Sequence, residues 1–391
     1  MTAVVPELEA LLAERPADAR VRAAGAFAAV AGDRPVVLHG AGGVGRSVLA
    51  ALRADGIEPL CFSDGGAQPG AAPVDGVAVL PMAEAVARHG AETVFVVTIL
   101  NPRFPYAEVR DALTAAGAAT VCSWILVGWA HPEGLLPHYA VDLPHRVLEE
   151  ADAVRAAYAL LDDDVSREQF RAQLAWRLTA DFEVLGEHLP TSEQYFSPDV
   201  LTLNAQDVFV DCGAYDGDTV ASLLEHRPEG VRQIVALEPD PENLAALEAR
   251  LATLTPELRD RVVVLPWAAG AHRGTARWSL PGTSSAGFAG DGELEVQVAP
   301  LDELLERAIV PTYVKMDIEG AEPDALRGAQ TTVTTHRPTL AICVYHAQDH
   351  LWSLPLAVAA LVDDYRFVLR RYLTDCWEVV LYAIPAERAG A

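Results

Sequence analysis

Lysine is almost absent from this chain of 391 residues, and basic residues as a whole are scarce. Lys315 is the only lysine among 29 basic residues, which stand against 55 acidic ones and leave a formal net charge of −26. Nucleic acids and anionic membrane surfaces are bound through basic patches, so this balance argues against both as partners. It favours a neutral or cationic small-molecule ligand, unless the acidity serves solubility alone. A lone lysine among arginines also suggests a role that arginine cannot fill.

Cysteines are few, and long apolar runs are missing. The five cysteines are scattered, without a C-x-x-C pair, which argues against a disulfide framework and against a zinc site. The first residues are acidic and lack the features of a signal peptide, and no apolar run is long enough to span a membrane. We therefore expect a cytoplasmic protein with reduced cysteines.

The length of the chain predicts two domains, because single hydrophobic cores stop growing beyond about 250 to 300 residues. Residues 33–145 alternate short apolar strands with helices, and residues 206–391 repeat this alternation. The pattern predicts an α/β fold class with two Rossmann-like parallel-sheet domains. Residues 1–32 are expected to form a helical lead-in, and residues 146–205 a helical connector.

The end of the second series breaks the alternation. Residues 367–372 and 378–384 have the pattern of strands, but the segment between them is too short for a helix, which predicts an antiparallel pair. A parallel sheet that finishes in such a pair is typical of class I methyltransferases, which use S-adenosylmethionine (SAM).

A glycine turn follows the first strand of this second series, in the segment VFVDCGAYDGDT. Gly213 and Gly217 would let the backbone turn tightly and approach a ligand, and a side chain at Gly213 would occupy cofactor space. The G-x-x-x-G spacing differs from the G-x-G-x-x-G of dinucleotide sites. Asp211 and Asp216 would supply charge near a cationic amine and sulfonium. The turn residues expected to bind the cofactor are Asp211, Gly213, Ala214, Tyr215, Asp216, Gly217 and Thr219.

A second acid stands at the end of the next strand, where Glu238 could accept hydrogen bonds from a ribose diol. Pro239 follows it and precedes a helix, and Trp267 and Ala268 come after the third strand, where they could flank an adenine. One acid at a strand end is weak evidence, but two at consecutive strand ends, with the glycine turn, predict a SAM site.

These residues resemble the FkbM family of methyltransferases over about 190 residues. The resemblance rests on VFVDCGAYDGDT, ALEPDPENL, LDELL and above all YVKMDIEGAEPDAL at 313–326, which is similar to a K-x-D-x-E-G-x-E core. The segment AICVYHAQDHLWSLP at 341–355 also resembles a form of this family. The resemblance implies a class I fold, SAM as cofactor and usually O-methylation, but not the identity of the acceptor.

The predicted reacting centre lies where the fourth and fifth strands of this domain end. Lys315 and Asp317 should point to the same side, Glu319 follows in the next turn, and His346 ends the neighbouring strand. We expect His346 or Asp317 to act as the base that takes a proton from an alcohol, with Lys315 as an orienting charge. Asp317 would also lie beside the cofactor.

Structural explanations compete with these roles. Lys315 could form an ion pair with Glu319 or Glu322 without a catalytic part, and His346 could be a capping or core histidine. Magnesium held by Asp317, Glu319 and His346 is another alternative, but no compact ligand motif supports it, so no metal is predicted.

The first half carries its own glycine pattern. Gly40, Gly42 and Gly45 match G-x-G-x-x-G after a strand, and Asp64 ends the next strand, where an acid could bind a ribose. The segment resembles the N-terminal nucleotide-sugar-binding domain of sugar acetyltransferases and the dinucleotide-type domains of sugar-modifying enzymes. Three interpretations stay open: binding of the nucleotide or sugar part of an acceptor, a scaffold or homodimer contact, and a working NAD site.

The sequence thus predicts a SAM-dependent methyltransferase that acts on a hydroxyl of a small molecule or sugar, which can be nucleotide-linked, in natural-product or glycan biosynthesis. The first alternative is an NAD(P)-dependent oxidoreductase that uses the turn at Gly40 to Gly45. The second is a non-catalytic binding protein with a relic SAM fold.

Overall fold

The computed structural model describes residues 5–279, 287–288, 294–305 and 308–388 of the chain. The chain divides into two compact units. Unit 1 consists of Met1–Asp152, Arg171–Glu187 and Thr374–Trp377, and unit 2 of Ala153–Phe170, His188–Leu373 and Glu378–Ala391. Each unit therefore combines segments that are far apart in the sequence, and the expected connector at 146–205 is divided between them.

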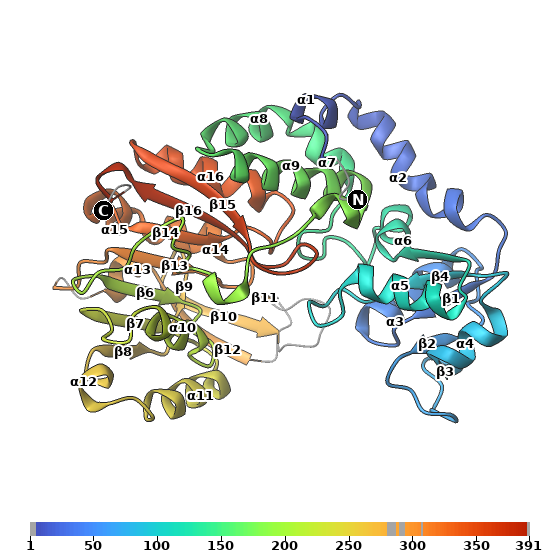
Figure 1. Cartoon of the computed structure of the whole chain (residues 1–391), viewed down its shortest axis with the longest axis horizontal. Coiled ribbons are helices and arrows are strands. Elements are labelled where there is room, and N and C mark those ends of the chain that lie inside the picture. The colour runs from blue at the N-terminus through green and yellow to red at the C-terminus, as the bar shows by residue number, and fades with distance from the viewer. Residues whose placement is uncertain (1–4, 280–286, 289–293, 306–307, 389–391) are drawn as a thin grey trace. The chain divides into compact units, whose positions relative to one another are not determined.

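A five-stranded parallel sheet forms the centre of unit 1, in the order β3–β2–β1–β4–β5 (Figure 1). Its central strands β1 and β4 are buried along their whole length and consist mainly of valine, as expected for parallel strands that are covered on both faces. β3 is not among the strands expected from the sequence. The strands are β1 (Val36–His39), β2 (Phe62–Asp64), β3 (Val79–Pro81), β4 (Val94–Val97) and β5 (Thr120–Ser123).

Helices connect these strands and bury their apolar sides in the core. Leu113 of α5 and Ala85 of α4 pack in one cluster with Val37, Phe95 and Val97 of the sheet. The helices of the first half and the segment after it are α1 (Leu8–Leu11), α2 (Pro16–Ala31), α3 (Gly43–Ala54), α4 (Met82–His89), α5 (Tyr106–Ala116), α6 (Ile125–Ala130), α7 (Pro144–Glu149), α8 (Ala151–Leu160) and α9 (Asp164–Thr179), with short 3₁₀ turns η1 (Phe182–Leu185) and η2 (Thr191–Glu193).

Unit 2 contains a seven-stranded sheet in the order β15–β16–β14–β13–β6–β7–β8, which can be followed from the red strands to the olive ones in Figure 1. Five strands are parallel, and β16 pairs antiparallel with both β14 and β15. This confirms the expected α/β class and the antiparallel pair at the end. The strands are β6 (Val208–Cys212), β7 (Gln233–Leu237), β8 (Val262–Leu265), β13 (Tyr313–Met316), β14 (Thr339–Cys343), β15 (Tyr365–Arg371) and β16 (Val379–Pro385).

Local sequence signals explain where the helices of unit 2 begin. The Asp240 side chain accepts hydrogen bonds from the backbone N–H groups of Glu242 (2.8 Å) and Asn243 (3.0 Å), and Pro241 occupies the first helical position of α11. The helices are α10 (Asp218–His226), α11 (Pro241–Leu251), α12 (Pro256–Arg259), α13 (Leu301–Leu304), α14 (Glu322–Arg327), α15 (Gln330–His336) and α16 (His350–Leu361), followed by η3 (Ala386–Arg388).

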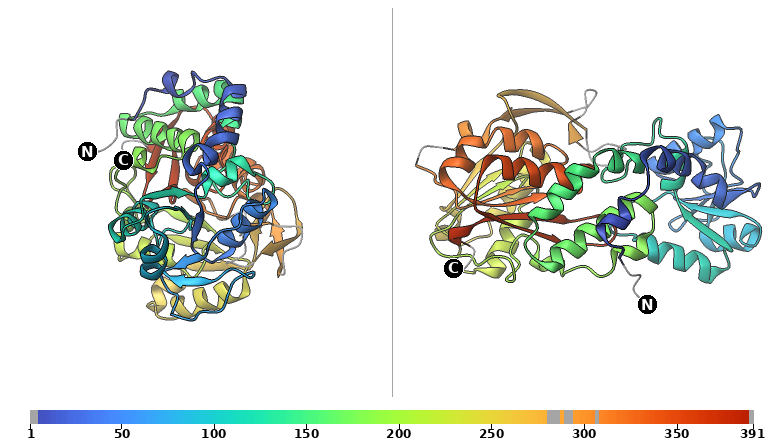
Figure 2. Two further views of the ribbon diagram at one scale, coloured as in Figure 1. Left: turned by 90° about the vertical axis from the view of Figure 1, so that its right-hand side faces the viewer. Right: turned by 90° about the horizontal axis from the view of Figure 1, so that it is seen from above.

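A second, four-stranded sheet in unit 2 was not predicted. It has the order β11–β10–β12–β9, with β9 (Ala268–Ala269), β10 (Gly274–Ser279), β11 (Gly287–Phe288) and β12 (Leu294–Ala299). Figure 2 shows its yellow-orange strands projecting from the side of unit 2. β9 and β11 have only two residues each, but β10 and β12 have six, and β12 (LEVQVA) alternates apolar and polar residues, a strand signal that the sequence analysis missed.

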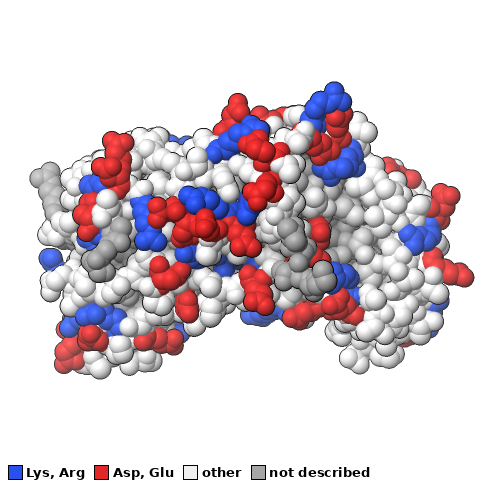
Figure 3. Space-filling model, turned by 45° about the horizontal axis from the view of Figure 1, so that its top comes forward, with Lys and Arg blue, Asp and Glu red and all other residues white. Residues whose placement is uncertain are grey.

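The molecular surface fits the expectation that this acidic chain does not bind polyanions. On the face shown in Figure 3, acidic and basic side chains are interspersed, and the basic residues drawn there form no continuous patch. None of the helices in the described part of the chain is both long and apolar enough to cross a membrane.

Candidate active site

The carboxyl ends of four neighbouring parallel strands of unit 2 meet at one edge of the sheet. Cys212 at the end of β6 lies level with Leu237 of β7 and with Met316 of β13, which lies level with Ile342 of β14. Open α/β sheets bind ligands beyond the carboxyl ends of their strands. The turns that follow these strands carry most of the residues singled out from the sequence.

The turn between β6 and α10 requires glycine for reasons internal to the fold. Gly213 has φ +86°, and a Cβ atom there would lie 2.0 Å from the backbone oxygen of Asp317. Gly217 has φ +85°, and its Cβ would lie 2.9 Å from Cδ1 of Leu247. A side chain at position 213 would therefore disturb the fold, which corrects the expectation that it would only fill cofactor space.

The acid after β7 is held beside this turn. Glu238 accepts hydrogen bonds from the backbone N–H of Tyr215 at Oε2 (2.9 Å) and from the N–H of Asp240 at Oε1 (2.9 Å). Burial raises the pKa of Glu238, and these N–H groups oppose that effect. Tyr215 has φ +47° and is 54% exposed, so the turn presents an open aromatic residue.

The other predicted cofactor residues differ in accessibility. Asp216 is bound by Arg250, with 2.6 Å between Oδ2 and Nη2. The negative charge that was expected to face the cationic amine of the cofactor is therefore already balanced by an arginine. The ring of Trp267 lies under the guanidinium of Arg273, 4.8 Å from its carbon to the ring centroid. Pro239 is partly exposed, whereas Ala214, Thr219 and Ala268 are buried. Their contacts with a cofactor stay predictions.

Lys315 and Asp211 form a buried ion pair below the glycine turn. Nζ lies 3.0 Å from Oδ1, and the side chains are 2% and 0% exposed. Nζ also donates a hydrogen bond to the backbone oxygen of Gly213 (2.6 Å). Burial alone would lower the pKa of Lys315, but the carboxylates of Asp211 and Asp317 outweigh it and raise the pKa. Burial raises the pKa of Asp211 to about 6 despite Lys315.

This ion pair changes two expectations. Lys315 pairs with Asp211 rather than with Glu319 or Glu322, which were the partners considered from the sequence. Asp211 was expected to supply charge to the cofactor, but its carboxylate is fully buried against Lys315. The pair therefore does not face a ligand directly, and Lys315 stabilises the turn through its hydrogen bond to the Gly213 carbonyl.

His346 is enclosed by carboxylates. Nδ1 lies 2.8 Å from Oε1 of Glu322, and Nε2 lies 3.4 Å from Oδ1 of Asp317 and 3.9 Å from Oε2 of Glu319. Burial would lower the pKa of His346, but the three carboxylates raise it to about 10. The imidazole is therefore protonated at neutral pH, which argues against His346 as the base and against a histidine titration near pH 6 to 7.

Asp317 is partly open, with its side chain 24% exposed, compared with 40% for Glu319. The hydroxyl of Tyr195 donates to Oδ2 (2.8 Å), and that of Tyr345 lies 3.4 Å from Oδ1. Burial would raise the pKa of Asp317, but Lys315 and His346 outweigh it and hold the pKa below its usual value. An ionised, oriented carboxylate thus stands at the end of β13.

The loop after Asp317 is shaped by two residues with left-handed backbone. Glu319 has φ +55° and Gly320 φ +97°. Glu322, fully buried at the start of α14, closes this loop because its Oε1 accepts the backbone N–H of Ile318 (2.9 Å) as well as contacting His346. Burial raises the pKa of Glu319, the more exposed of the two acids.

Four residues of this cluster were not predicted as site residues from the sequence: Gln194, Tyr195, Tyr345 and Glu378. Glu378 precedes β16 with φ +53° and accepts hydrogen bonds from the Tyr345 hydroxyl at Oε1 (3.3 Å) and from Nε2 of Gln194 at Oε2. Burial and the nearby Asp317 raise the pKa of Glu378 to about 7. The polar stretch TSEQY before β6 was the only signal, and it resembled an ordinary surface segment.

Asp317, Glu322 and His346 each have an atom that could ligate a metal ion, and these three atoms lie within 4.8 Å of one another. The set considered for magnesium had Glu319 in place of Glu322. Here the protonated imidazole already supplies positive charge among these acids. The cluster is thus explained by ion pairing, and the predicted lack of a metal stays a prediction.

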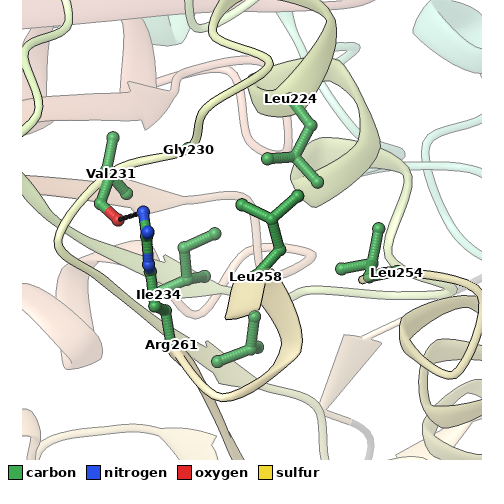
Figure 4. A pocket seen from close by; sticks show the side chains of 8 residues that line it. Leu224, Gly230, Val231, Ile234, Leu254, Leu258 and Arg261 are labelled. Carbon is green, nitrogen blue, oxygen red and sulfur yellow. Dashed lines mark hydrogen bonds between the residues drawn. The ribbon is translucent and has the colours of Figure 1, made fainter. Parts of the chain in front are cut away.

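An apolar pocket of unit 2 lies elsewhere. Gly230 and Val231 precede β7 and Arg261 precedes β8, so the pocket opens at the amino ends of these strands, opposite to the carboxyl ends (Figure 4). Nη1 of Arg261 is bound to the carbonyl oxygens of Glu229 (2.9 Å) and Val231 (3.2 Å). This pocket is separate from the clustered acids and offers no comparable chemistry.

The glycine turn of unit 1 is closed by packing. A Cβ at Gly45 would lie 2.1 Å from the backbone oxygen of Gly40, so Gly45 brings α3 against the end of β1. Asp64 accepts hydrogen bonds from the backbone N–H groups of Ala41 at Oδ2 (3.2 Å) and Gly66 at Oδ1 (2.9 Å). The three interpretations of this turn stay predictions.

Comparison with known proteins shows similarity to methyltransferases. Residues 211–371, which lie within unit 2, match the model of the methyltransferase FkbM domain. The 2-O-methyltransferase NoeI of Sinorhizobium fredii is 25% identical over 199 residues, which cover 46% of this chain and 79% of NoeI. The crystal structure of methyltransferase FkbM from Methylobacillus flagellatus has a TM-score of 0.77 at 24% identity, with 96% of this chain and 97% of that chain covered, so the two share a fold.

Proposed function

We propose that the chain, whose residues 211–371 match the model of the methyltransferase FkbM domain, transfers a methyl group from SAM to a hydroxyl of a small molecule or sugar. NoeI supports oxygen as the acceptor atom, because its name describes a 2-O-methyltransferase. The net charge of −26 favours a neutral or cationic acceptor.

Groups at the carboxyl edge of the sheet support SAM as the proposed cofactor. Glu238 has two carboxylate oxygens at the turn for a ribose diol, Tyr215 and Trp267 offer aromatic surface, and Gly213 keeps the turn tight. SAM supplies an electrophilic methyl group on a sulfonium. The chain has to orient an acceptor oxygen towards that methyl, exclude water and receive one proton.

The observation that carries the proposal is the Asp317 carboxylate. It is ionised, partly exposed and fixed by Tyr195, and it follows β13 directly beside the turn at Gly213. An acceptor hydroxyl that donates a hydrogen bond to Asp317 would have its oxygen lone pair directed away from that bond, towards a methyl donor. Asp317 then takes the proton as the new oxygen–carbon bond forms.

Lys315 and His346 act through Asp317 and the turn. Both are cations that keep Asp317 ionised, which makes it a hydrogen-bond acceptor at neutral pH. Lys315 also fixes the Gly213 carbonyl. Neither is the base in this mechanism.

The cofactor assignment is tested by titration calorimetry with SAM and with NAD. Glu238→Ala should weaken SAM binding by about 2 kcal/mol or more, because hydrogen bonds to a charged group are lost. Glu242→Ala, an exposed acid of the same segment, is the matched control and should bind SAM normally. Binding of NAD without SAM would instead favour an oxidoreductase, and binding of neither would favour a relic fold.

The acceptor chemistry is tested with tritiated SAM and a panel of methyl glycosides, phenols and the matching amines. We expect label on hydroxyl compounds and a fall of about 100-fold or more in rate for Asp317→Asn, with SAM affinity near normal. Label confined to the amines, or an unchanged rate in Asp317→Asn, would contradict the proposed reaction.

A further inference from the structure

A second carboxyl group lies behind Asp317, on the side of β16. The Tyr345 hydroxyl stands between the two acids, 3.4 Å from Oδ1 of Asp317 and 3.3 Å from Oε1 of Glu378. Gln194 donates a hydrogen bond to the other oxygen of Glu378. Asp317 follows β13, Tyr345 follows β14 and Glu378 precedes β16, so the fold brings these three groups together from distant parts of the sequence.

Methylation of a hydroxyl releases one proton for each methyl group. The acceptor oxygen forms the new bond with a lone pair, the electrons of the broken carbon–sulfur bond stay on sulfur, and the O–H proton passes to Asp317. For a second turnover this proton has to leave Asp317. His346 cannot take it, because the imidazole is already protonated at neutral pH.

We propose that Tyr345 and Glu378 form the path by which the acceptor proton leaves Asp317, an inference that rests on the proposed O-methylation. Protonated Asp317 donates to the Tyr345 oxygen while the Tyr345 hydroxyl proton moves to Glu378. Charge and atoms balance: Asp317 loses one proton, Tyr345 gains one and loses one, and Glu378 gains one. Glu378 then releases its proton to water. Glu378 is partly exposed, which gives the proton an exit. Neither residue touches the acceptor in this scheme, so both act through Asp317.

The electrostatics favour transfer in this direction. Lys315 and His346 hold the pKa of Asp317 low, whereas burial and Asp317 itself raise the pKa of Glu378 to about 7. The groups that face Glu378 are Asp317, Tyr345, Gln194 and Cys343. His346, Lys315 and Tyr195 also interact with it electrostatically. A proton on Asp317 therefore moves to the weaker acid. Long hydrogen bonds of this kind commonly shorten when a substrate binds.

The first arm of the test needs no acceptor. Infrared difference spectra of the full chain with ¹³C-labelled glutamate should show a carboxyl group that titrates near pH 7 and that is missing in Glu378→Gln. The same band should remain in Tyr345→Phe, because Glu378 keeps its burial and its contact with Gln194. Asp317→Asn should shift the titration to lower pH, because the neighbouring negative charge is gone.

The second arm uses the hydroxyl compound of the panel that accepts most label. In the wild type kcat should rise with pH through about 7, as Glu378 becomes able to accept a proton. Glu378→Gln and Tyr345→Phe should lower kcat by about 10-fold or more, lose this step and leave KM nearly unchanged. Glu225→Gln and Tyr365→Phe, which alter an exposed acid and a hydroxyl bound to the Pro338 carbonyl, are the matched controls.

The outcomes separate the two proposals. Methyl transfer to hydroxyls with the same pH profile in Glu378→Gln or Tyr345→Phe as in the wild type would overturn the proton path and leave O-methylation intact. Normal SAM binding without transfer to any hydroxyl probe would overturn O-methylation, and the path with it. Loss of the infrared titration in Tyr345→Phe would mean that the tyrosine only supports the structure around Glu378, which also contradicts the path.

Discussion

The glycine turns after β1 in unit 1 and after β6 in unit 2 are similar, but different side chains lie beside them. In each unit, a central parallel strand turns through glycine into a helix, and the next strand outward ends near an acid. At matching register positions, unit 1 pairs Leu38 of β1 with Val96 of β4, whereas unit 2 pairs Asp211 of β6 with Lys315 of β13. An apolar contact in one unit thus corresponds to a buried ion pair in the other.

The turn itself is held in the same way in both units. The carbonyl of Gly40 accepts a hydrogen bond from Oγ1 of Thr98 (2.7 Å), and that of Gly213 accepts one from Nζ of Lys315 (2.6 Å). A neutral hydroxyl is therefore sufficient to hold such a turn. A buried ion pair rarely adds stability over apolar residues, so we infer that unit 2 retains it for the electrostatics of Asp317.

The largest predicted effect comes from breaking this ion pair. Lys315→Met should destabilise unit 2 by about 3 kcal/mol or more at pH 8, because Asp211 is left buried without a partner. The loss should shrink as the pH falls and Asp211 becomes protonated. Urea unfolding, followed together with hydrogen exchange of β6 and β13, measures both effects.

A double variant gives the sharper comparison. Asp211→Leu combined with Lys315→Met gives unit 2 an apolar pair like that of unit 1, and it should regain most of the stability lost in the single variant. Methyl transfer should stay impaired, because Asp317 has lost a neighbouring cation. A double variant with normal activity would show that the ion pair serves folding alone.

The second effect compares a glycine from each turn. Gly213→Ala should destabilise unit 2 by about 2 to 3 kcal/mol, because φ is positive there and the Asp317 carbonyl lies where Cβ would be. Gly42→Ala should cost no more than about 1 kcal/mol, because Gly42 is the N-cap of α3, where alanine is disfavoured, but its φ is −78° and a Cβ there meets nothing within 4 Å. Similar unfolding curves for the two variants would contradict this account.

The fold was largely accessible from the sequence because its main signals are local. Local patterns predict the elements in which they occur. Examples are the apolar runs of β6 and β13 and the aspartate and proline at the start of α11. β3 was missed because three residues carry too little pattern. In the four-stranded sheet β9 and β11 are equally short, whereas the alternation of β12 was a signal that went unused. The division of residues 146–205 between units depends on packing that no local pattern encodes.

The site could be predicted from the sequence only in part, because the protonation of a buried side chain depends on the residues that surround it in the fold. Strand order brought Lys315, Asp317 and His346 together as expected. The partner of Lys315 and the protonation of His346 followed from carboxylates whose positions the sequence could not give. Tyr195 and Glu378 enter through long-range contacts, from a segment before β6 and from the start of β16.

The third effect contrasts one histidine of each unit under changing pH. The folded pKa of His346 is raised to about 10, so its stabilisation is complete below the unfolded value of about 6.5 and is lost as the pH rises through about 10. Burial lowers the folded pKa of His39, so its contribution is present above about 6.5 and is lost as the pH falls. Each slope is at most about 1.4 kcal/mol per pH unit.

Urea unfolding at a series of pH values measures these slopes, with the unit 2 transition identified as the one that Lys315→Met shifts. His346→Gln should remove the alkaline slope from unit 2 and leave the acidic behaviour of unit 1 unchanged, and His39→Gln should do the reverse. An alkaline slope that persists in His346→Gln would mean that the imidazole is not the protonated group among these acids.

The smallest effect concerns the neutral hydrogen bond that takes the place of Lys315 in unit 1. Thr98→Val keeps the shape of the side chain but removes the donor to the carbonyls of His39 (3.0 Å) and Gly40 (2.7 Å), and should cost about 1 kcal/mol. Thr98→Ser keeps the hydroxyl and is the matched control for this donor. Because neither partner is charged, the cost should not vary with pH, unlike that of Lys315→Met. A pH-dependent loss in Thr98→Val, or one as large as that of Lys315→Met, would mean that the two turns do not differ in the way their carbonyls are held.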